Sequence, residues 1–233
     1  MSTFLGEKKV QLVVTYSEQR AREIEEDYKL FCSQVYVIPP RDLIFFSADL
    51  QGNAIIAERM KAFAALYQNE AKVIITTMDA LMSAAVPFEQ LMSHVIKLKE
   101  GDELDLEKLK HDLTVMGYER VGRVEEPGQF TVHGGIADVY PLTMEVPVRI
   151  ELWGDEIDTI RCFEPQSQRS MDQIESVSVF PAAEVIADDT ARRRAVGMIQ
   201  NELESQLAVF KKAKEPDKAK RLREAVSYTH LRA

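Results

Sequence analysis

Three short apolar runs, separated by segments with helical periodicity, constrain the first part of the chain more than any other feature. The runs span residues 10–15, 35–38 and 73–76. Continuous apolar runs of this length are typical of strands buried on both faces, and strands that alternate with helices form a parallel sheet with crossover helices. The sequence therefore predicts an α/β lobe with a parallel sheet over residues 1–86.

The segments between these runs have the pattern of helices that cover such a sheet. In the first segment, Ser17 is the expected N-cap. A second helix is expected over residues 54–67. The apolar stripe of the first helix recurs at helical spacing and should face the sheet; it consists of Ala21, Ile24, Tyr28 and Phe31.

A phosphate-binding loop is missing from this pattern. Parallel sheets bind nucleotides where a strand leads through a glycine-rich loop into a helix. The sequence contains no G-x-x-x-x-G-K-[ST] motif, and Gly6 and Gly52 are isolated. We therefore expect a partial P-loop-like lobe without the phosphate loop, and neither a cofactor nor ATP turnover in this chain.

From about Pro87 the pattern changes to short alternating strands around one helix. Asp105 is the expected N-cap of this helix, and Gly117 is expected to end it. This pattern predicts a second, α+β domain over residues 87–175, with an antiparallel sheet and one helix. Its strands are expected at residues 95–99, 118–124, 130–133 and 136–140.

Residues 147–163 are expected to complete this sheet as a β-hairpin with Gly154 in its turn. Side chains two positions apart share a face, so Arg149, Glu151 and Trp153 should point outward while the apolar residues between them face the core. Tryptophan and arginine are enriched at the energetic centres of protein interfaces. This face is therefore a candidate interaction surface. The alternative is a solvated face with cross-strand ion pairs and a tryptophan packed on a neighbouring loop.

The remainder of the chain is predicted to contain a returning strand at residues 177–180 and then a helical segment. Thr190 is the expected cap of a helix that reaches about Lys214. The strand and the helices form a predicted third segment, residues 176–226. Residues 227–233, SYTHLRA, are expected to be a non-native tail.

Composition and charge narrow the classes of function. The net charge of −9 opposes autonomous nucleic-acid binding, because neutralisation of phosphates supplies most non-specific affinity. Basic clusters at residues 192–194, 211–214 and 218–223 are either a weak DNA-facing surface or solvated helix faces.

The two cysteines belong to no Cys-x-x-Cys pair, and the histidines have no metal-ligand spacing. With no membrane-length apolar run and no secretory signal, a cytoplasmic protein is expected.

Residues 116–170 resemble a known family. Together, the elements GYER, EEPGQF, the Gly-Gly turn, D-x-[YF]-P, RIEL-aromatic-GDEID and FEPQSQRS are similar to the UvrA-interacting domain. This domain is shared by the nucleotide excision repair protein UvrB and bacterial transcription-repair coupling factors (Mfd). The similarity extends from residue 8 to about 225. The short link from Thr76 to Val95, without the DNA-threading hairpin of UvrB, favours the coupling factors.

The resemblance implies a non-catalytic recruitment module, as a truncated fragment of a coupling factor. It would bind UvrA and thereby bring nucleotide excision repair to stalled RNA polymerase. In the family this module does not hydrolyse ATP, and the RNA-polymerase-binding domain and the ATP-dependent DNA translocase follow later. RNA polymerase and DNA are therefore expected as partners only through the remainder of such a protein. The alternative is a fragment of a DNA-dependent ATPase or helicase such as UvrB.

The UvrA-contacting positions of the family fall on four residues of this chain. Arg149 matches the arginine at the head of the R-[IL]-[ED] strand, and Trp153 matches an aromatic that is usually Phe. Arg120, in the element GYER, corresponds to an arginine used by UvrB. His133 stands where the family usually has arginine. Because a neutral imidazole lacks the permanent charged fork of arginine, this contact is expected to be weaker or pH-dependent. If Arg149 is a central contact, its replacement by Ala should cost about 2 kcal/mol of binding energy or more.

Overall fold

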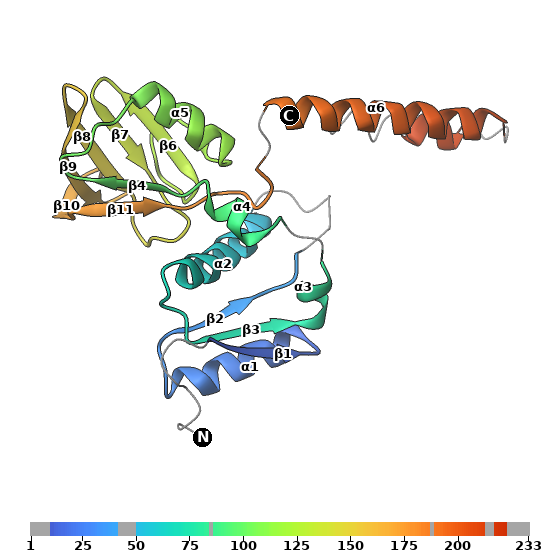
Figure 1. Cartoon of the computed structure of the whole chain (residues 1–233), viewed down its shortest axis with the longest axis horizontal. Helices are drawn as coiled ribbons and strands as arrows, with labels where there is room; N and C mark the ends of the chain where they lie inside the picture. Colours follow the sequence, from blue (N-terminus) through green and yellow to red (C-terminus); the bar gives the residue numbers. More distant parts are fainter. Residues whose placement is uncertain (1–9, 42–49, 84–85, 187–188, 213–216, 223–233) are drawn as a thin grey trace. The chain divides into compact units, whose positions relative to one another are not determined.

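The computed structural model describes residues 10–41, 50–83, 86–186, 189–212 and 217–222. The chain divides into two units, residues 1–186 and residues 187–233. The first unit contains two regions of sheet and helix, and the described residues of the second unit are helical (Figure 1). In the part of the chain so described, no helix is both long and apolar enough to cross a membrane. Its helices and its three sheets, counted among the described residues, give a mixed α/β fold.

The first region is a three-stranded parallel sheet between two helices. Its strands are β1 (Gln11–Thr15), β2 (Val35–Ile38) and β3 (Val73–Thr77), in the order β1-β3-β2. Helix α1 (Glu18–Lys29) covers one face and α2 (Leu50–Tyr67) the other (Figure 1). The predicted parallel sheet with crossover helices is confirmed; its likeness to a P-loop lobe stays a prediction.

Local signals set the limits of α1. The Ser17 side chain accepts a hydrogen bond from the Arg20 backbone N–H, which confirms the predicted cap. The helix ends at Lys29, and Phe31 lies beyond it with 89% of its surface exposed. The prediction that Phe31 continues the buried stripe is wrong, because the chain has left the helix before reaching it. Ala21 is fully buried against the sheet, as expected.

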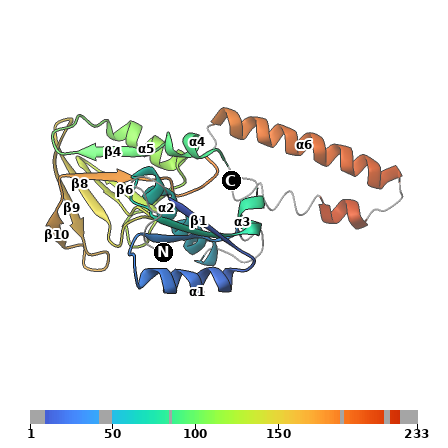
Figure 2. The same cartoon turned by 60° about the horizontal axis from the view of Figure 1, so that its bottom comes forward.

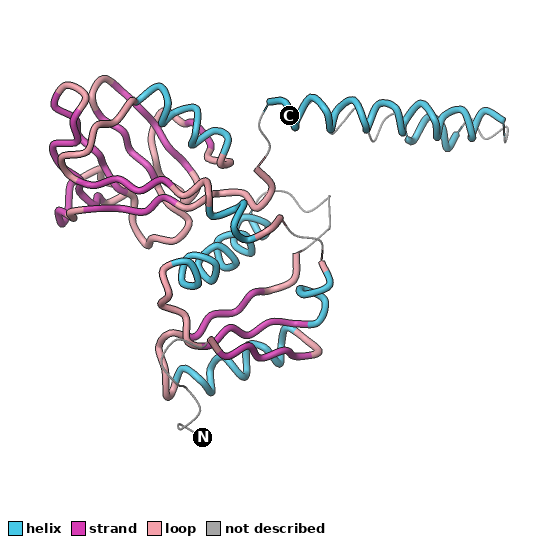
Figure 3. The backbone as a smooth tube through the Cα atoms, in the orientation of Figure 1, coloured by secondary structure: helices cyan, strands magenta, loops and turns pink. Residues whose placement is uncertain are grey.

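Two helices that the sequence analysis did not predict, α3 (Met78–Met82) and α4 (Phe88–Met92), lead from β3 into the second region. The larger sheet of that region has the order β10-β9-β8-β7-β6-β5, and Figure 3 shows its strands in magenta. The strands are β5 (Glu119–Arg120), β6 (Gln129–His133), β7 (Ile136–Val139), β8 (Val148–Trp153), β9 (Glu156–Phe163) and β10 (Ser170–Gln173).

This sheet departs from prediction at both edges. Strand β5 pairs parallel to β6, with Glu119 aligned with Gln129, so the predicted all-antiparallel sheet is wrong at this edge. The reason is the loop that follows Arg120, which brings the chain back beside the start of β5 and shortens the predicted strand to two residues. At the other edge, β10 adds an unpredicted strand next to β9 (Figure 2).

A separate ribbon and one helix complete the core of this region. Strand β4 (Ile96–Lys99) pairs antiparallel with β11 (Ser176–Val179). The part of the chain beyond the predicted boundary at residue 175 therefore packs on the same core.

Helix α5 (Leu106–Val115) begins at the predicted cap, where the Asp105 carboxylate accepts hydrogen bonds from two backbone N–H groups. Gly117 follows the helix at φ +92°, where an added Cβ would lie 2.6 Å from the Cβ of Ala183. The domain boundaries themselves stay predictions.

The second unit contains α6 (Asp189–Lys212), followed by helical residues 217–222. The predicted long helix is confirmed, although it starts before Thr190, so Thr190 is not its cap. Leu203 and Phe210 are half-buried, whereas Ile199 is exposed. Residues 1–9, 213–216 and 223–233 lie outside the described residues, including Gly6, Lys214 and the predicted tail.

Candidate protein-binding surface

The six-stranded sheet has one core face and one face that carries most of the predicted site residues. On β8, Val148 and Ile150 are fully buried, whereas Trp153 is 84% exposed. The predicted alternation along this strand is therefore confirmed. Because residues paired directly across strands share a face, the register extends this face to the neighbouring strands. We call it the outer face; it comprises Thr131, His133, Ile136, Asp138, Arg149, Glu151, Trp153, Thr159 and Arg161.

Arg149 is held in place by its neighbour on β7. Its Nε and Nη2 each donate a hydrogen bond of 2.8 Å to a different carboxylate oxygen of Asp138. Its guanidinium carbon lies 4.7 Å from the ring centroid of Phe163, which is fully buried. Hydrogen bonding to Asp138 raises the pKa of Arg149 above its ordinary value. Arg149 thus lies on the predicted face, half-buried, with two of its three guanidinium nitrogens already engaged.

Trp153 ends β8 beside the hairpin turn and lies opposite Glu156. The turn follows the prediction, with Gly154 at φ +68°. A second apolar side chain, Ile136, is 40% exposed on the same face. An indole this exposed contributes little to the core, so the arrangement leaves Trp153 available to a partner.

The structure brings His133 to the outer face but not Arg120. His133 is exposed at the end of β6 and lies opposite Ile136. Arg120 is exposed on the edge strand β5, where it is aligned with Phe130, a core residue. The register therefore places Arg120 on the other side of the sheet. Whether any of the four predicted residues contacts UvrA stays a prediction.

Arg161, which was not predicted as a site residue, lies directly opposite Arg149. In a regular hairpin with a two-residue turn, Arg149 would pair with Ile160, and Arg161 would face the core. A β-bulge between Glu151 and Leu152 shifts the register by one residue and turns Arg161 to the outer face. Within the described residues Arg161 makes no hydrogen bond or ion pair, and its Nε is buried without a partner. The bulge leaves no clear signal in the sequence.

A second charged cluster lies elsewhere in the first unit. Glu184 accepts hydrogen bonds from both Arg41 and Arg59, and Arg59 also donates to the carbonyl oxygen of Pro39. Glu184 and Arg59 are 7% and 3% exposed. Burial acts to raise the pKa of Glu184, but the hydrogen bonds from the two arginines outweigh it and leave that pKa below its ordinary value. This cluster is closed and structural.

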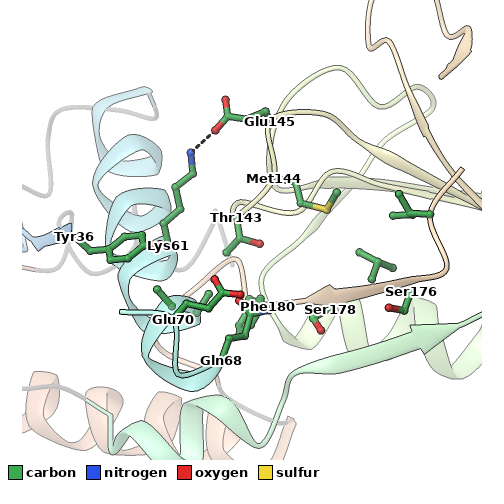
Figure 4. A pocket seen from close by; sticks show the side chains of 14 residues that line it. Tyr36, Lys61, Gln68, Glu70, Thr143, Met144, Glu145, Ser176, Ser178 and Phe180 are labelled. Atoms are coloured by element: carbon green, nitrogen blue, oxygen red, sulfur yellow. Dashed lines mark hydrogen bonds and ion pairs between the residues drawn. The ribbon is translucent and has the colours of Figure 1, made fainter. Parts of the chain in front are cut away.

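A cavity of about 330 Å³ lies in the first unit between α2, the loop before β8 and β11 (Figure 4). Lys61 and Glu145 form an ion pair of 2.9 Å at this cavity. Its lining mixes aliphatic, amide and hydroxyl side chains, such as Met144, Gln68 and Ser178. None of the predicted site residues lines it, so the outer face remains the candidate surface.

Comparison with known proteins gives two results. Residues 96–184 match the family model of the UvrB interaction domain. The chain is also similar to proteins named transcription-repair-coupling factor. The one from Staphylococcus haemolyticus (strain JCSC1435) is 34% identical over 205 residues, which are 87% of this chain and 17% of that protein. The one from Bacillus subtilis (strain 168) is 30% identical over 207 residues, 88% of this chain and 18% of that protein.

The matched residues 96–184 run from β4 to just beyond β11 and include the whole six-stranded sheet with its outer face. The chain spans less than a fifth of the length of these relatives, 17% and 18%. Residues 96–184 thus match the UvrB interaction domain family, and the chain as a whole is similar to one segment of transcription-repair-coupling factors.

Proposed function

We propose that the outer face binds UvrA and that the chain serves as a recruitment module in transcription-coupled DNA repair. The observation that carries this proposal is the exposed indole of Trp153 at the end of β8, on the same face as the half-buried Arg149 and Arg161. Aromatic and arginine side chains held on a preformed strand are typical of the centre of a protein interface. The family and the names of the relatives support the choice of partner.

The local charges favour a protein over a nucleic acid as the occupant. Glu151, Glu156 and Asp158 surround the hairpin end, and the whole chain carries a net charge of −9. A duplex would need several cations to neutralise its phosphates. We further expect that RNA polymerase and DNA are contacted only through the remainder of the full-length protein.

We further propose that this chain is not an enzyme and needs no cofactor. The first region would correspond to a P-loop-like lobe that has no phosphate loop, since no Walker-type motif occurs in the sequence. The competing function is a fragment of a DNA-dependent ATPase or helicase such as UvrB. Turnover of ATP by the purified chain, stimulated by DNA, would favour that alternative.

A calorimetric titration of the full chain with purified UvrA tests the proposal. Trp153→Ala should weaken binding by about 2 kcal/mol or more, because a central interface aromatic is lost. Phe31→Ala is the matched control, since Phe31 is another aromatic with 89% of its surface exposed, far from the outer face in sequence. Both variants should keep the wild-type melting temperature. Equal affinities for the two variants would contradict the proposal.

A further inference from the structure

One row of side chains crosses four strands of the outer face. Thr131, Asp138, Arg149 and Arg161 lie on β6, β7, β8 and β9, and each is directly opposite the next. Side chains in such a row are near neighbours, and like charges that face each other directly are destabilising. The row therefore holds two arginines at opposing positions of β8 and β9 but only one carboxylate.

The single carboxylate of the row is committed to one of the two arginines. Asp138 is 6% exposed, and each of its oxygens accepts a hydrogen bond from Arg149. Glu151, in the next row, accepts a hydrogen bond of 3.4 Å from the Thr159 hydroxyl. On β10, Gln173 is aligned with Arg161 but donates to Glu100. Each of these neighbouring polar groups thus has a partner other than Arg161.

Arg161 carries one buried hydrogen-bond donor without a partner, its Nε. The residue is half-buried, and no ion pair of Arg161 occurs among the described residues. A buried donor without a partner is costly and is rare in folded proteins. A guanidinium in this state gains most from a carboxylate, which it binds through two parallel hydrogen bonds.

We infer that Arg161 is the anchor for an acidic side chain, Asp or Glu, of the protein that docks on the outer face. Arg149 is then a positioning residue, because it occupies Asp138 and keeps that carboxylate away from Arg161. The inference rests on the proposed function and specifies the chemistry that UvrA must present. Trp153, farther along β8, supplies the apolar contact beside this charged one.

Affinity for UvrA and thermal stability, measured together on the full chain, test this inference. Arg161→Gln should weaken binding by about tenfold or more, and Arg161→Lys should recover only part of the loss, because Lys lacks the bidentate fork. The effect should shrink at high salt. The melting temperature of Arg161→Gln should equal or exceed that of the wild type, since a repulsive, unpaired charge is removed. A structural arginine would instead lower it.

The outcomes separate this inference from the proposed function. If Trp153→Ala loses UvrA binding while Arg161→Gln keeps it, the inference is wrong and the proposed function stands. If Arg161→Gln lowers the melting temperature, Arg161 is structural and the inference is also wrong. A wild-type chain that does not bind UvrA contradicts both. Binding to a labelled DNA duplex that depends on Arg161 would show that the occupant is a phosphate, which overturns the acidic protein partner.

Discussion

Two clusters in the first unit have the same composition, two arginines and one carboxylate, but opposite states. In the cluster around Glu184, both arginines donate to the carboxylate. On the outer face, Asp138 accepts hydrogen bonds from Arg149 only, and Arg161 has no partner among the described residues. In the closed cluster each charge has a partner, so removing one member leaves another buried and unpaired. In the open cluster one arginine is already without a partner among the described residues.

Of the substitutions in the two clusters, the one that opens the closed cluster should lower the unfolding free energy most. Glu184→Ala leaves Arg59 buried without its counter-charge, so we expect a loss of about 3–5 kcal/mol of unfolding free energy. Urea denaturation followed by circular dichroism measures this. The control is Glu145→Ala, which removes an ion pair whose carboxylate is 89% exposed and should cost less than about 1 kcal/mol. Similar losses in the two variants would remove the distinction between closed and exposed ion pairs.

On the outer face, Asp138→Asn should have an intermediate effect. It removes the counter-charge of Arg149 and leaves the two arginines at opposing positions of β8 and β9 without a carboxylate. We expect a loss of about 1.5–3 kcal/mol in the unfolding free energy, the usual size for hydrogen bonds to charged groups. The double variant Asp138→Asn with Arg161→Gln should recover part of it. If Arg161→Gln alone destabilises the chain as much as Asp138→Asn, the outer-face cluster is closed after all.

The stability of the closed cluster should also depend on pH. Since the pKa of Glu184 is lower in the folded chain than its ordinary value of 4.5, the unfolded chain takes up the proton first as the pH falls. The contribution of Glu184 is therefore complete above pH 4.5 and is lost as the pH falls through the lowered folded pKa. Melting curves of wild type and Glu184→Gln should converge in this acidic range. A stability difference that stays constant there would show that the ionised carboxylate is not responsible.

The smallest effect is expected at the rim of the outer face. His133→Arg adds a permanent charge at an exposed position and should strengthen UvrA binding by about 0.2–1 kcal/mol, the usual range for exposed charge pairs. His111→Arg, at an exposed position of α5, is the control for a general charge effect. If both substitutions change the affinity equally, His133 has no specific place in the interface.

Local patterns in the sequence were enough to predict most of the fold. The cap at Ser17, the cap at Asp105 and the turn at Gly154 depend on neighbouring residues only, and all three are found. The apolar runs likewise predicted the parallel strands, but only β3 is buried at every position. The expectation of burial on both faces is wrong for β1, an edge strand on which Leu12 and Val14 are exposed. The outward direction of Arg149 and Trp153 followed from simple alternation.

What the sequence did not reveal depends on pairing between distant residues. The β-bulge that turns Arg161 outward is a property of the β8–β9 register. The parallel pairing of β5 with β6, which places Arg120 on the other side of the sheet, depends on the path of a loop. The pairing of Asp138 with Arg149 joins two strands that no local motif connects. Periodicity describes one strand at a time and carries no information on such pairs.

The most direct test of the central claim uses the fact that Trp153 is the sole tryptophan of the chain. Replacing it biosynthetically with 5-hydroxytryptophan allows its fluorescence to be excited selectively in the presence of UvrA. Acrylamide quenching of this fluorescence should be strong in the free chain, where the indole is 84% exposed, and should fall several-fold at saturating UvrA. Unchanged quenching in a complex whose saturation is shown by sedimentation would contradict binding through the outer face.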